Sequence, residues 1–258
     1  MSDYFAVPSG VRQGGILSPY FFSVYVDDLI GELRKSGYGC YIASQFVACI
    51  FYADDVALLS PTLFGMQKLI DICSSYGQAN AISYNQKKTK VMYFGKPKFM
   101  ISPDSFRLNG GIIEIVHSWK YLGFYLQSHD GSLNFDPREE LKSFYRASDS
   151  MINALHKPSE EVLMQLFFSN CVSILAYGLE VKEYLARDMR SIHVAMNDGI
   201  RKIFGWNRWE SVRELRSTFG YKDIYIMAES RRKAFLSSFT RLDNPILNYL
   251  KQNSSLFM

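Results

Sequence analysis

Two pairs of adjacent aspartates, Asp27–Asp28 and Asp54–Asp55, are the residues of this chain best suited to metal-dependent chemistry. They stand in the stretches FSVYVDDLI and IFYADDVALL, each after an aromatic and a small apolar residue. Mg²⁺ prefers oxygen ligands, and paired carboxylates are typical of enzymes that transfer phosphoryl groups with bound metal ions. The backbone that carries each pair decides whether the pair can hold a metal ion.

The first pair is predicted to lie on the surface of a helix over residues 19–36. Ser18 followed by Pro19 is a helix start signal, and Gly37 is a typical stop. The apolar stripe of this helix consists of Phe22, Val26, Leu29, Ile30 and Leu33. At about 100° per residue, both aspartates point away from that stripe. We therefore expect this pair to be solvated charge with no role in metal binding.

The second pair is predicted to lie at the tip of a β-hairpin. The apolar run QFVACIFY precedes it and VALLS follows it, with only Ala53, Asp54 and Asp55 between the two runs. Two short apolar runs around a polar turn are typical of a hairpin. A hairpin packed on a core would hold both carboxylates rigidly, as a metal site requires.

The composition is that of a folded protein with one large or two small domains, since 48% of the 258 residues are hydrophobic. The net charge of +4 permits a nucleic-acid partner without requiring one. Cys40, Cys49, Cys73 and Cys171 lack zinc-ligand spacing, so we expect neither a zinc site nor a disulfide framework. The sequence shows no signal-peptide pattern and no long apolar run. We expect a soluble intracellular protein, in the nucleus or the cytoplasm.

The first part of the chain, residues 1–130, is predicted to mix helices and strands. A second helix is expected over residues 63–76, and Asn109–Gly110 is a hairpin turn signal. Further strands are expected at residues 81–85, 91–94, 106–110, 112–116 and 120–126.

The second part, residues 131–258, is predicted to be helical. A loop is expected at residues 128–137, and successive helices follow it. Breaks between these helices are expected near Pro158, Gly178 and Gly205, because proline and glycine end helices.

Four motifs of the first part follow one another in a specific order. SGVRQGGILSP precedes the first expected helix, FYADD forms the hairpin tip, NQKKT follows the second helix, and WKYLG comes last. In order and spacing they resemble motifs B, C, D and E of the palm of reverse transcriptases, most closely those of non-LTR retrotransposons. The resemblance covers about residues 8–126. More loosely, LAYGLEV and RKIFGWNRWESVREL are similar to the thumb of such proteins.

This resemblance implies an α+β fold. It implies a right-hand polymerase-like palm, an antiparallel sheet with packed helices, in residues 1–130, and a helical thumb and C-terminal region in residues 131–258. The implied activity of the full-length parent is that of an RNA-directed DNA polymerase, by nucleotidyl transfer with two Mg²⁺ ions about 3.5–4 Å apart. Its partners would be an RNA template, a DNA primer, the RNA–DNA hybrid and dNTPs, with no membrane.

The resemblance also assigns roles to individual residues. Asp54 would be the main metal ligand and Asp55 a second, less direct one. Lys88 would act as an acid or a charge clamp at the departing pyrophosphate. The contacts to template and nucleotide would come from Ser9, Gly10, Arg12, Gln13 and Gly14. The primer grip would consist of Trp119, Tyr121, Leu122 and Gly123.

Alternatives to an active polymerase remain open. One is a catalytically dead palm–thumb remnant that binds nucleic acid in a salt-dependent way, with binding that survives Asp54→Asn. Another is a decayed remnant without a folded product. Among enzymes, a group II intron maturase-like protein is the runner-up. The thumb-like part adds basic residues that either line a hybrid-binding face or are ordinary surface charges: Arg187, Arg190, Arg201, Lys202, Arg208, Arg213 and Arg216.

The family's third carboxylate belongs to motif A, well upstream of motif B, whereas seven residues precede Pro8 in this sequence. We therefore expect the isolated 258-residue chain to be inactive in Mg²⁺-dependent primer extension on an RNA template. The reason is that a lost metal ligand lowers affinity and rate by orders of magnitude. Incorporation that requires both Mg²⁺ and Asp54 would contradict this expectation.

Overall fold

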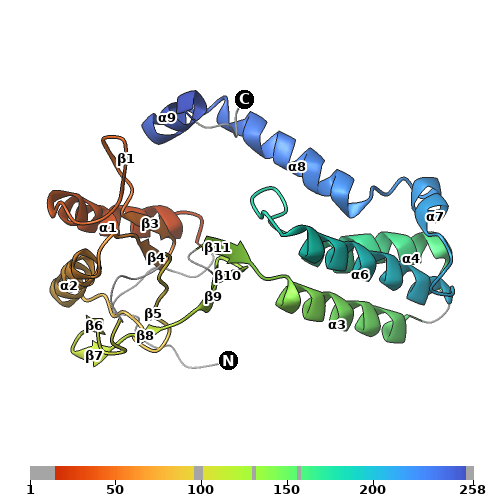
Figure 1. Ribbon diagram of the computed structural model, residues 1–258, viewed down its shortest axis with the longest axis horizontal. Coiled ribbons are helices and arrows are strands. Elements are labelled where there is room, and N and C mark those ends of the chain that lie inside the picture. Colours follow the sequence, from red (N-terminus) through yellow and green to blue (C-terminus); the bar gives the residue numbers. More distant parts are fainter. Residues whose placement is uncertain (1–14, 96–100, 130–131, 156–157, 254–258) are drawn as a thin grey trace. The chain divides into compact units, whose positions relative to one another are not determined.

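The structure is a computed structural model that describes residues 15–95, 101–129, 132–155 and 158–253. The chain forms two compact units (Figure 1). The first is made of Met1–Val91, Phe99–Ile115 and Asn248–Asn253, and the second of Met92–Lys98, Val116–Leu247 and Ser254–Met258. Helices and small sheets occur together, which agrees with the expected α+β class.

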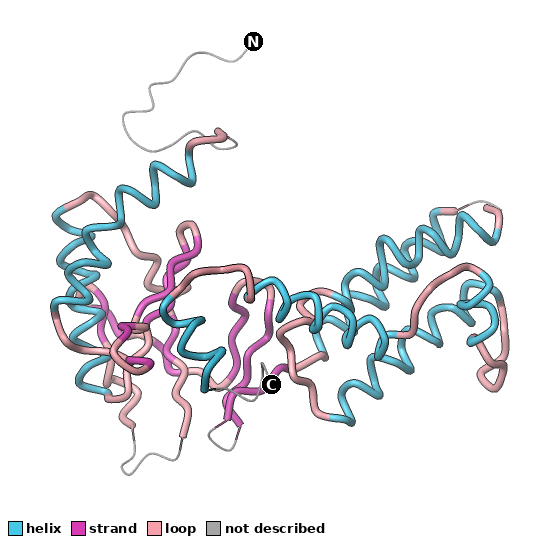
Figure 2. The backbone as a smooth tube through the Cα atoms, turned by 90° about the horizontal axis from the view of Figure 1, so that it is seen from above, coloured by secondary structure: helices cyan, strands magenta, loops and turns pink. Residues whose placement is uncertain are grey.

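The first unit combines two long helices with short strand pairs (Figure 2). Three pairs are antiparallel, β1 with β2, β3 with β4 and β6 with β7, and β5 pairs with β8 in parallel. The elements are α1 (Ser18–Lys35), β1 (Tyr41–Ile42), β2 (Gln45–Phe46), β3 (Cys49–Tyr52), β4 (Asp55–Leu58), α2 (Leu63–Ala79), β5 (Lys90–Val91), β6 (Arg107–Leu108), β7 (Gly111–Ile112) and β8 (Glu114–Ile115).

The core of this unit forms where α1 and α2 pack together. Leu29 and Leu33 of α1 and Leu69 of α2 are fully buried there, because their spacing places them on facing helical stripes. Thr62 caps α2 by accepting a hydrogen bond from the Gly65 backbone N–H. Both expected helices are thus confirmed. The first aspartate pair is exposed on α1, as predicted.

The turn Asn109–Gly110 is confirmed as a two-residue hairpin turn. Both residues have positive φ, 50° and 81°, and the register pairs Leu108 with Gly111. The strand expected at residues 91–94 is reduced to β5, and the one expected at residues 112–116 is divided between β7 and β8. The strand expected at residues 81–85 is wrong. Past α2 the chain folds back onto the helix end, where the Ile82 N–H donates to the carbonyl of Gly77, and this contact replaces strand pairing.

The second unit joins a three-stranded antiparallel sheet to a set of helices. Its strands are β9 (Ser118–Tyr121), β10 (Phe124–His129) and β11 (Ser132–Phe135), in the order β11-β10-β9. The helices are α3 (Arg138–Ala154), α4 (Glu160–Leu166), a π-helical turn (Phe167–Val172), α5 (Ser173–Ala176), α6 (Ala186–Phe204), α7 (Arg213–Thr218) and α8 (Ile224–Phe239), and α9 (Pro245–Asn253) follows them.

Two expectations for this region differ from the structure. The single strand expected at residues 120–126 is a hairpin, because the chain turns at Leu122–Gly123 between β9 and β10. The loop expected at residues 128–137 is largely strand, because β10 continues to His129 and β11 returns beside it. Polar residues in β11 obscure the alternation of apolar and polar side chains from which a strand is predicted. The strands β9 to β11 also group with the helices in the second compact unit, and the division into a palm of residues 1–130 and a helical thumb stays a prediction.

The core of the second unit combines aliphatic side chains with two buried phenylalanines and lies between α3, α4 and α6 (Figure 1). Phe144 and Phe167 meet edge to face there, with ring centroids 5.8 Å apart. Gly199 lets α6 approach them, since a Cβ at this position would lie 2.7 Å from the Phe167 ring. The expected breaks are confirmed at Gly178 and Gly205, both of which adopt left-handed φ.

A network of polar side chains ties α6 to α7 and α8. Asp223 accepts hydrogen bonds from Arg216 at 2.5 Å and from the backbone N–H of Tyr225, and it contacts His193 at 3.0 Å. Burial by itself raises the pKa of Asp223, but these hydrogen bonds and charges outweigh it and hold that pKa below its ordinary value. Arg216 also donates to Asn197 and is therefore a structural residue of the interior.

None of the helices in the described residues is both long enough and apolar enough to cross a membrane.

Gly199→Ala is expected to destabilise the protein by about 1–3 kcal/mol, because the new methyl group would overpack the two phenylalanine rings. Gly31→Ala, in α1, is the matched control, since nothing lies within 4 Å of its Cβ position. We expect the control to be neutral or to stabilise by up to about 1 kcal/mol. Urea unfolding of both variants measures the difference, and equal midpoints would contradict the assigned packing.

Candidate functional site

The hairpin β3–β4 carries Asp54 and Asp55, as predicted. Its register pairs Tyr52 with Asp55, so Ala53 and Asp54 form a two-residue turn. Ala53 adopts a φ of 49°, a left-handed conformation that is uncommon for a residue with a side chain. Both carboxylates are exposed at this tip.

The strands of the hairpin have one inward and one outward face. Cys49 and Phe51 of β3 and Leu58 of β4 pack against the core of the first unit. Ile50 and Tyr52 alternate with them and are 50% and 64% exposed. These inward residues hold the hairpin on the core, and the two carboxylates at its turn are therefore held in place as well.

The two carboxylates fit the chemistry of a Mg²⁺ site in type, because both supply hard oxygen ligands. Among the residues that the structure describes, no group of three or more His, Cys, Asp or Glu side chains could hold a metal ion. A metal ion at this tip would need further ligands from outside the β3–β4 hairpin.

The stretch NQKKT forms a compact turn after α2. The side-chain oxygen of Asn85 accepts from the Lys88 backbone N–H at 3.1 Å, and the Asn85 carbonyl accepts from the Thr89 hydroxyl at 2.9 Å. Lys88 is exposed, whereas Lys90 begins β5 and pairs with Glu114. The turn thus fixes the backbone of Lys88 and leaves its side chain at the surface of the first unit.

The predicted primer grip lies on the hairpin β9–β10 of the second unit. Leu122 and Gly123 form its turn with φ values of 46° and 83°, and Tyr121 pairs with Phe124. Trp119 is 36% exposed, and the other three predicted residues are half-buried. The structure thus brings the four residues together at one turn.

The predicted template and nucleotide contacts, Ser9, Gly10, Arg12, Gln13 and Gly14, lie outside the described residues.

The residues that support the Leu122–Gly123 turn were not predicted from the sequence. The Tyr177 hydroxyl donates to the Leu122 carbonyl at 3.0 Å, and the Tyr177 ring stacks on Phe124 with centroids 5.3 Å apart. Gly178 was expected only as a helix break, yet it lies against Phe124. Both residues lie in the stretch LAYGLEV, whose similarity to a thumb marked it as important, but its pattern does not predict which strand it contacts.

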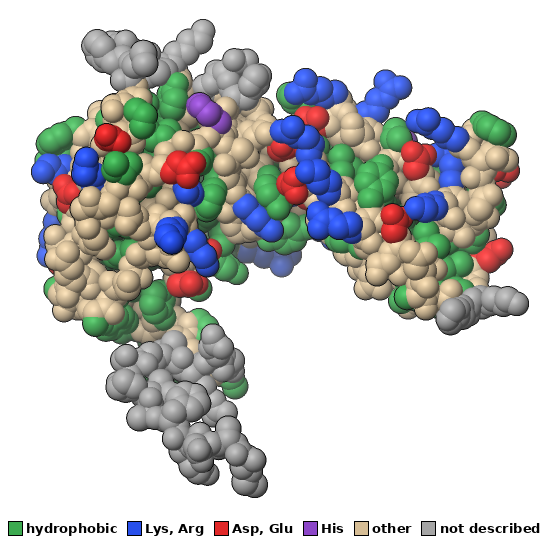
Figure 3. Space-filling view, turned by 90° about the horizontal axis from the view of Figure 1, so that it is seen from below, with side chains coloured by type: hydrophobic (Ala, Val, Ile, Leu, Met, Phe, Trp, Pro, Cys, Tyr) green, Lys and Arg blue, Asp and Glu red, His purple; other side chains and the backbone are tan. Residues whose placement is uncertain are grey.

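The basic residues of the second unit divide into two groups. On the face drawn in Figure 3, Lys and Arg side chains spread over the helices with acidic side chains among them. Arg201 pairs with Asp198, and Lys202 pairs with Asp149. With the interior Arg216, these residues have partners within the fold, although the Lys202–Asp149 pair is exposed. Arg187, Arg190, Arg208 and Arg213 are exposed and remain candidates for nucleic-acid contact.

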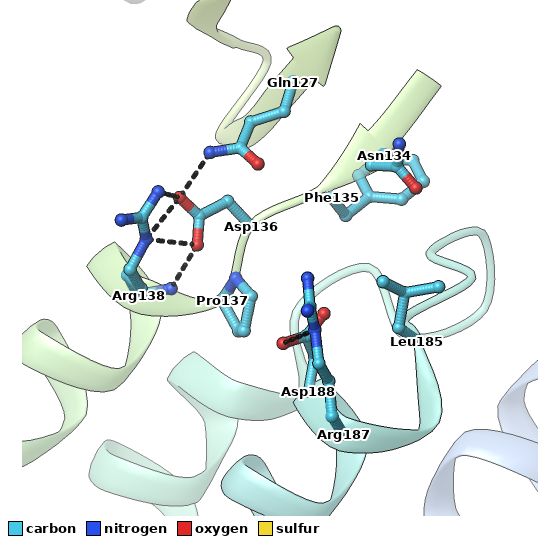
Figure 4. A pocket seen from close by; sticks show the side chains of 9 residues that line it. All are labelled: Gln127, Asn134, Phe135, Asp136, Pro137, Arg138, Leu185, Arg187 and Asp188. Atoms are coloured by element: carbon cyan, nitrogen blue, oxygen red, sulfur yellow. Dashed lines mark hydrogen bonds and ion pairs between the residues drawn. The ribbon is translucent and has the colours of Figure 1, made fainter. Parts of the chain in front are cut away.

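A pocket of about 360 Å³ also lies in the second unit, between the ends of β10 and β11 and the starts of α3 and α6 (Figure 4). Arg138 and Gln127 both donate to Asp136 there. Burial by itself raises the pKa of Asp136, but its hydrogen bonds with Arg138 and the charge of Arg138 hold that pKa below its ordinary value. Arg187 lies 3.7 Å from Asp188. The pocket's acidic and basic groups therefore face each other. Arg187, one of the basic residues predicted from the sequence, lines the pocket, whereas none of the predicted catalytic or primer-grip residues does.

Comparison with known proteins agrees with the motifs. Residues 3–126 match the family model described as reverse transcriptase (RNA-dependent DNA polymerase). The retrovirus-related Pol polyprotein from type-2 retrotransposable element R2DM of Drosophila melanogaster is 28% identical over 147 residues, 54% of this chain and 14% of that protein. The RNA-directed DNA polymerase from mobile element jockey of Drosophila funebris is 25% identical over 211 residues, 77% of this chain and 22% of that protein.

A third relative is the transposon TX1 uncharacterized 149 kDa protein of Xenopus laevis. It is 30% identical over 135 residues, 51% of this chain and 10% of that protein. The chain thus spans between 10% and 22% of the length of these three relatives.

The ordered motifs and the family match agree that residues 3–126 resemble reverse transcriptases (RNA-dependent DNA polymerases). Residues 3–126 are thus similar to the reverse transcriptase family, and the named relatives of the chain come from retrotransposable and mobile elements. The resemblance to the reverse transcriptases of non-LTR retrotransposons is confirmed. Such polymerases generally use divalent metal ions, a nucleic-acid template and dNTPs.

Asn85→Ala is expected to loosen the NQKKT turn, because the Lys88 backbone N–H loses its side-chain acceptor. The local loss is about 0.5–2 kcal/mol, as for other caps of this kind. Amide hydrogen exchange at Lys88 and Thr89 should quicken accordingly. Asn85→Asp keeps the acceptor oxygen and should leave the exchange near that of the natural chain, so equal exchange in all three proteins would contradict the assigned cap.

Proposed function

We propose that this chain is the part of a non-LTR retrotransposon reverse transcriptase that carries palm motifs B to E and the thumb. The elements α1 to β8 and the β9–β10 hairpin would belong to the palm, and the helices α3 to α8 to the thumb. The observation that carries the proposal is the β3–β4 hairpin, which supports two adjacent carboxylates on a core-packed scaffold at the position of motif C. The polymerase that contains this chain would copy RNA into DNA.

Each predicted residue has a role that its position permits. Asp54 and Asp55 would hold Mg²⁺, which supplies positive charge to the attacking and leaving oxygens when bound. The exposed ammonium of Lys88 would neutralise or protonate the departing pyrophosphate. Trp119 and Tyr121 would hold the primer end, so that its 3′-hydroxyl faces the α-phosphate of the incoming nucleotide.

The test is primer extension by the polypeptide encoded by the whole open reading frame around this chain. Asp54→Asn should lower Mg²⁺-dependent incorporation by roughly 100-fold or more, because it removes a charged metal ligand. Asp27→Asn is the matched control, since it removes the same charge from the surface of α1 and should leave the rate unchanged. Binding of an RNA–DNA hybrid should be similar in all three proteins.

Equal loss of incorporation in both variants would contradict the assigned metal site. If no protein extends the primer and all bind the hybrid with an affinity that falls as salt rises, the binding remnant replaces the polymerase as the function of this chain.

A further inference from the structure

The turn of the predicted primer grip accepts a hydrogen bond from a side chain outside its own hairpin. In a two-residue hairpin turn the backbone carbonyls at the tip have no partner on the opposite strand. The Leu122 carbonyl instead accepts from the hydroxyl of Tyr177, 3.0 Å away. Because Leu122 is a non-glycine residue with a φ of 46°, the turn depends on such support to keep this conformation.

Two glycines allow the turn and the Tyr177 segment to approach each other. A Cβ at Gly123 would lie 2.9 Å from the Tyr177 ring, and a Cβ at Gly178 would lie 2.2 Å from the Phe124 ring. The ring planes of Tyr177 and Phe124 are 28° apart, which makes a stacked contact between the two segments. A side chain at either glycine would push the segments apart.

The Tyr177 segment is itself anchored by a buried ion pair. Lys182 donates to Glu140 of α3 at 2.8 Å, and the two side chains are 1% and 9% exposed. The ammonium group of Lys182 also lies 5.1–5.7 Å from the ring centroids of Phe124, Tyr177 and Tyr184. The backbone N–H of Lys182 closes the bend by donating to the Gly178 carbonyl.

Tyr184, one of the three rings around the Lys182 ammonium, is uncharged. Burial, together with the negative charge of Glu140, raises the pKa of Tyr184, so its hydroxyl stays protonated beside that carboxylate. Helix α3 therefore fixes Lys182, Lys182 fixes the bend at Gly178, and the bend places the Tyr177 hydroxyl against the grip turn.

We propose that Tyr177 and Gly178 are positioning residues that hold the Leu122–Gly123 turn in register for the primer 3′ end. This inference rests on the proposed function of that turn as a primer grip. Trp119 lies on the strand that enters the turn, so a shift of the turn displaces the side chain that would contact the primer. Tyr177 is 50% exposed, and its hydroxyl can be removed without opening the core.

The test uses the 258-residue chain and two labelled RNA–DNA hybrids of equal length, one with a recessed primer 3′ end and one blunt. The measured quantity is the ratio of the two dissociation constants, from fluorescence anisotropy. Tyr177→Phe should lower the preference for the recessed end by about 3- to 10-fold, the range that one hydrogen bond accounts for. Gly178→Ala should lower it at least as much, because its methyl group displaces Phe124.

Tyr145→Phe is the matched control, since it removes the hydroxyl of an exposed tyrosine on α3 and should leave the ratio unchanged. Amide exchange at Leu122–Phe124 should quicken in Tyr177→Phe and not in the control. Equal urea midpoints in these two variants show that both remain folded, so Tyr177→Phe decides the question even if Gly178→Ala unfolds.

Trp119→Ala separates this inference from the function on which it rests. If Trp119→Ala lowers the ratio while Tyr177→Phe and Gly178→Ala do not, the positioning role is overturned and the primer grip stands. If the natural chain shows no preference, or Trp119→Ala leaves the ratio unchanged, the primer grip itself fails and the positioning role falls with it.

Discussion

The two-residue hairpin turn is the constraint on which the candidate site depends. Such a turn reverses the chain in the shortest possible distance and requires left-handed backbone, which costs a non-glycine residue about 1–3 kcal/mol. Ala53 and Leu122 both adopt it, at the tips of the hairpins that carry the carboxylates and the predicted primer grip. Surrounding contacts must hold each turn, because its own sequence does not favour the conformation.

The two hairpins receive this support in different ways. Inward residues of β3 and β4 bury themselves against α1 and α2, so the carboxylate tip is stabilised from below by apolar contacts. The grip turn instead has a polar tether from Tyr177 and a close aromatic contact at Phe124. Apolar burial fixes a strand face, whereas a hydrogen bond fixes one carbonyl, and the second kind of support makes the grip turn sensitive to a single hydroxyl group.

The charged residues of the helical unit show why composition is a weak guide to nucleic-acid contact. Of the basic residues in the thumb-like part, Arg216 lies inside a network with Asp223 and Asn197, and Arg201 and Lys202 are paired with carboxylates. Their charges are offset within the fold and contribute little to a field that attracts phosphates. A count of arginines therefore overestimates the surface that could bind a hybrid.

The sequence by itself determined the features that depend on local pattern. The α1 stripe, the hairpin at Asp54–Asp55, the Asn109–Gly110 turn and the order of the four motifs follow from residue types and their spacing, and the structure and the family match agree with them. These features rest on contacts between residues that are near in the chain, so periodicity and turn chemistry predict them.

Only the tertiary structure decided how the distant segments meet. The fold-back at Ile82, the strand β11, the pairing of Lys182 with Glu140 and the tether from Tyr177 to Leu122 were not predicted. The last two contacts join residues 42 and 55 positions apart, and a polar or aromatic side chain carries no mark of its distant partner. Packing selects that partner when the core forms, and this is why the support of the grip turn became visible only in the folded chain.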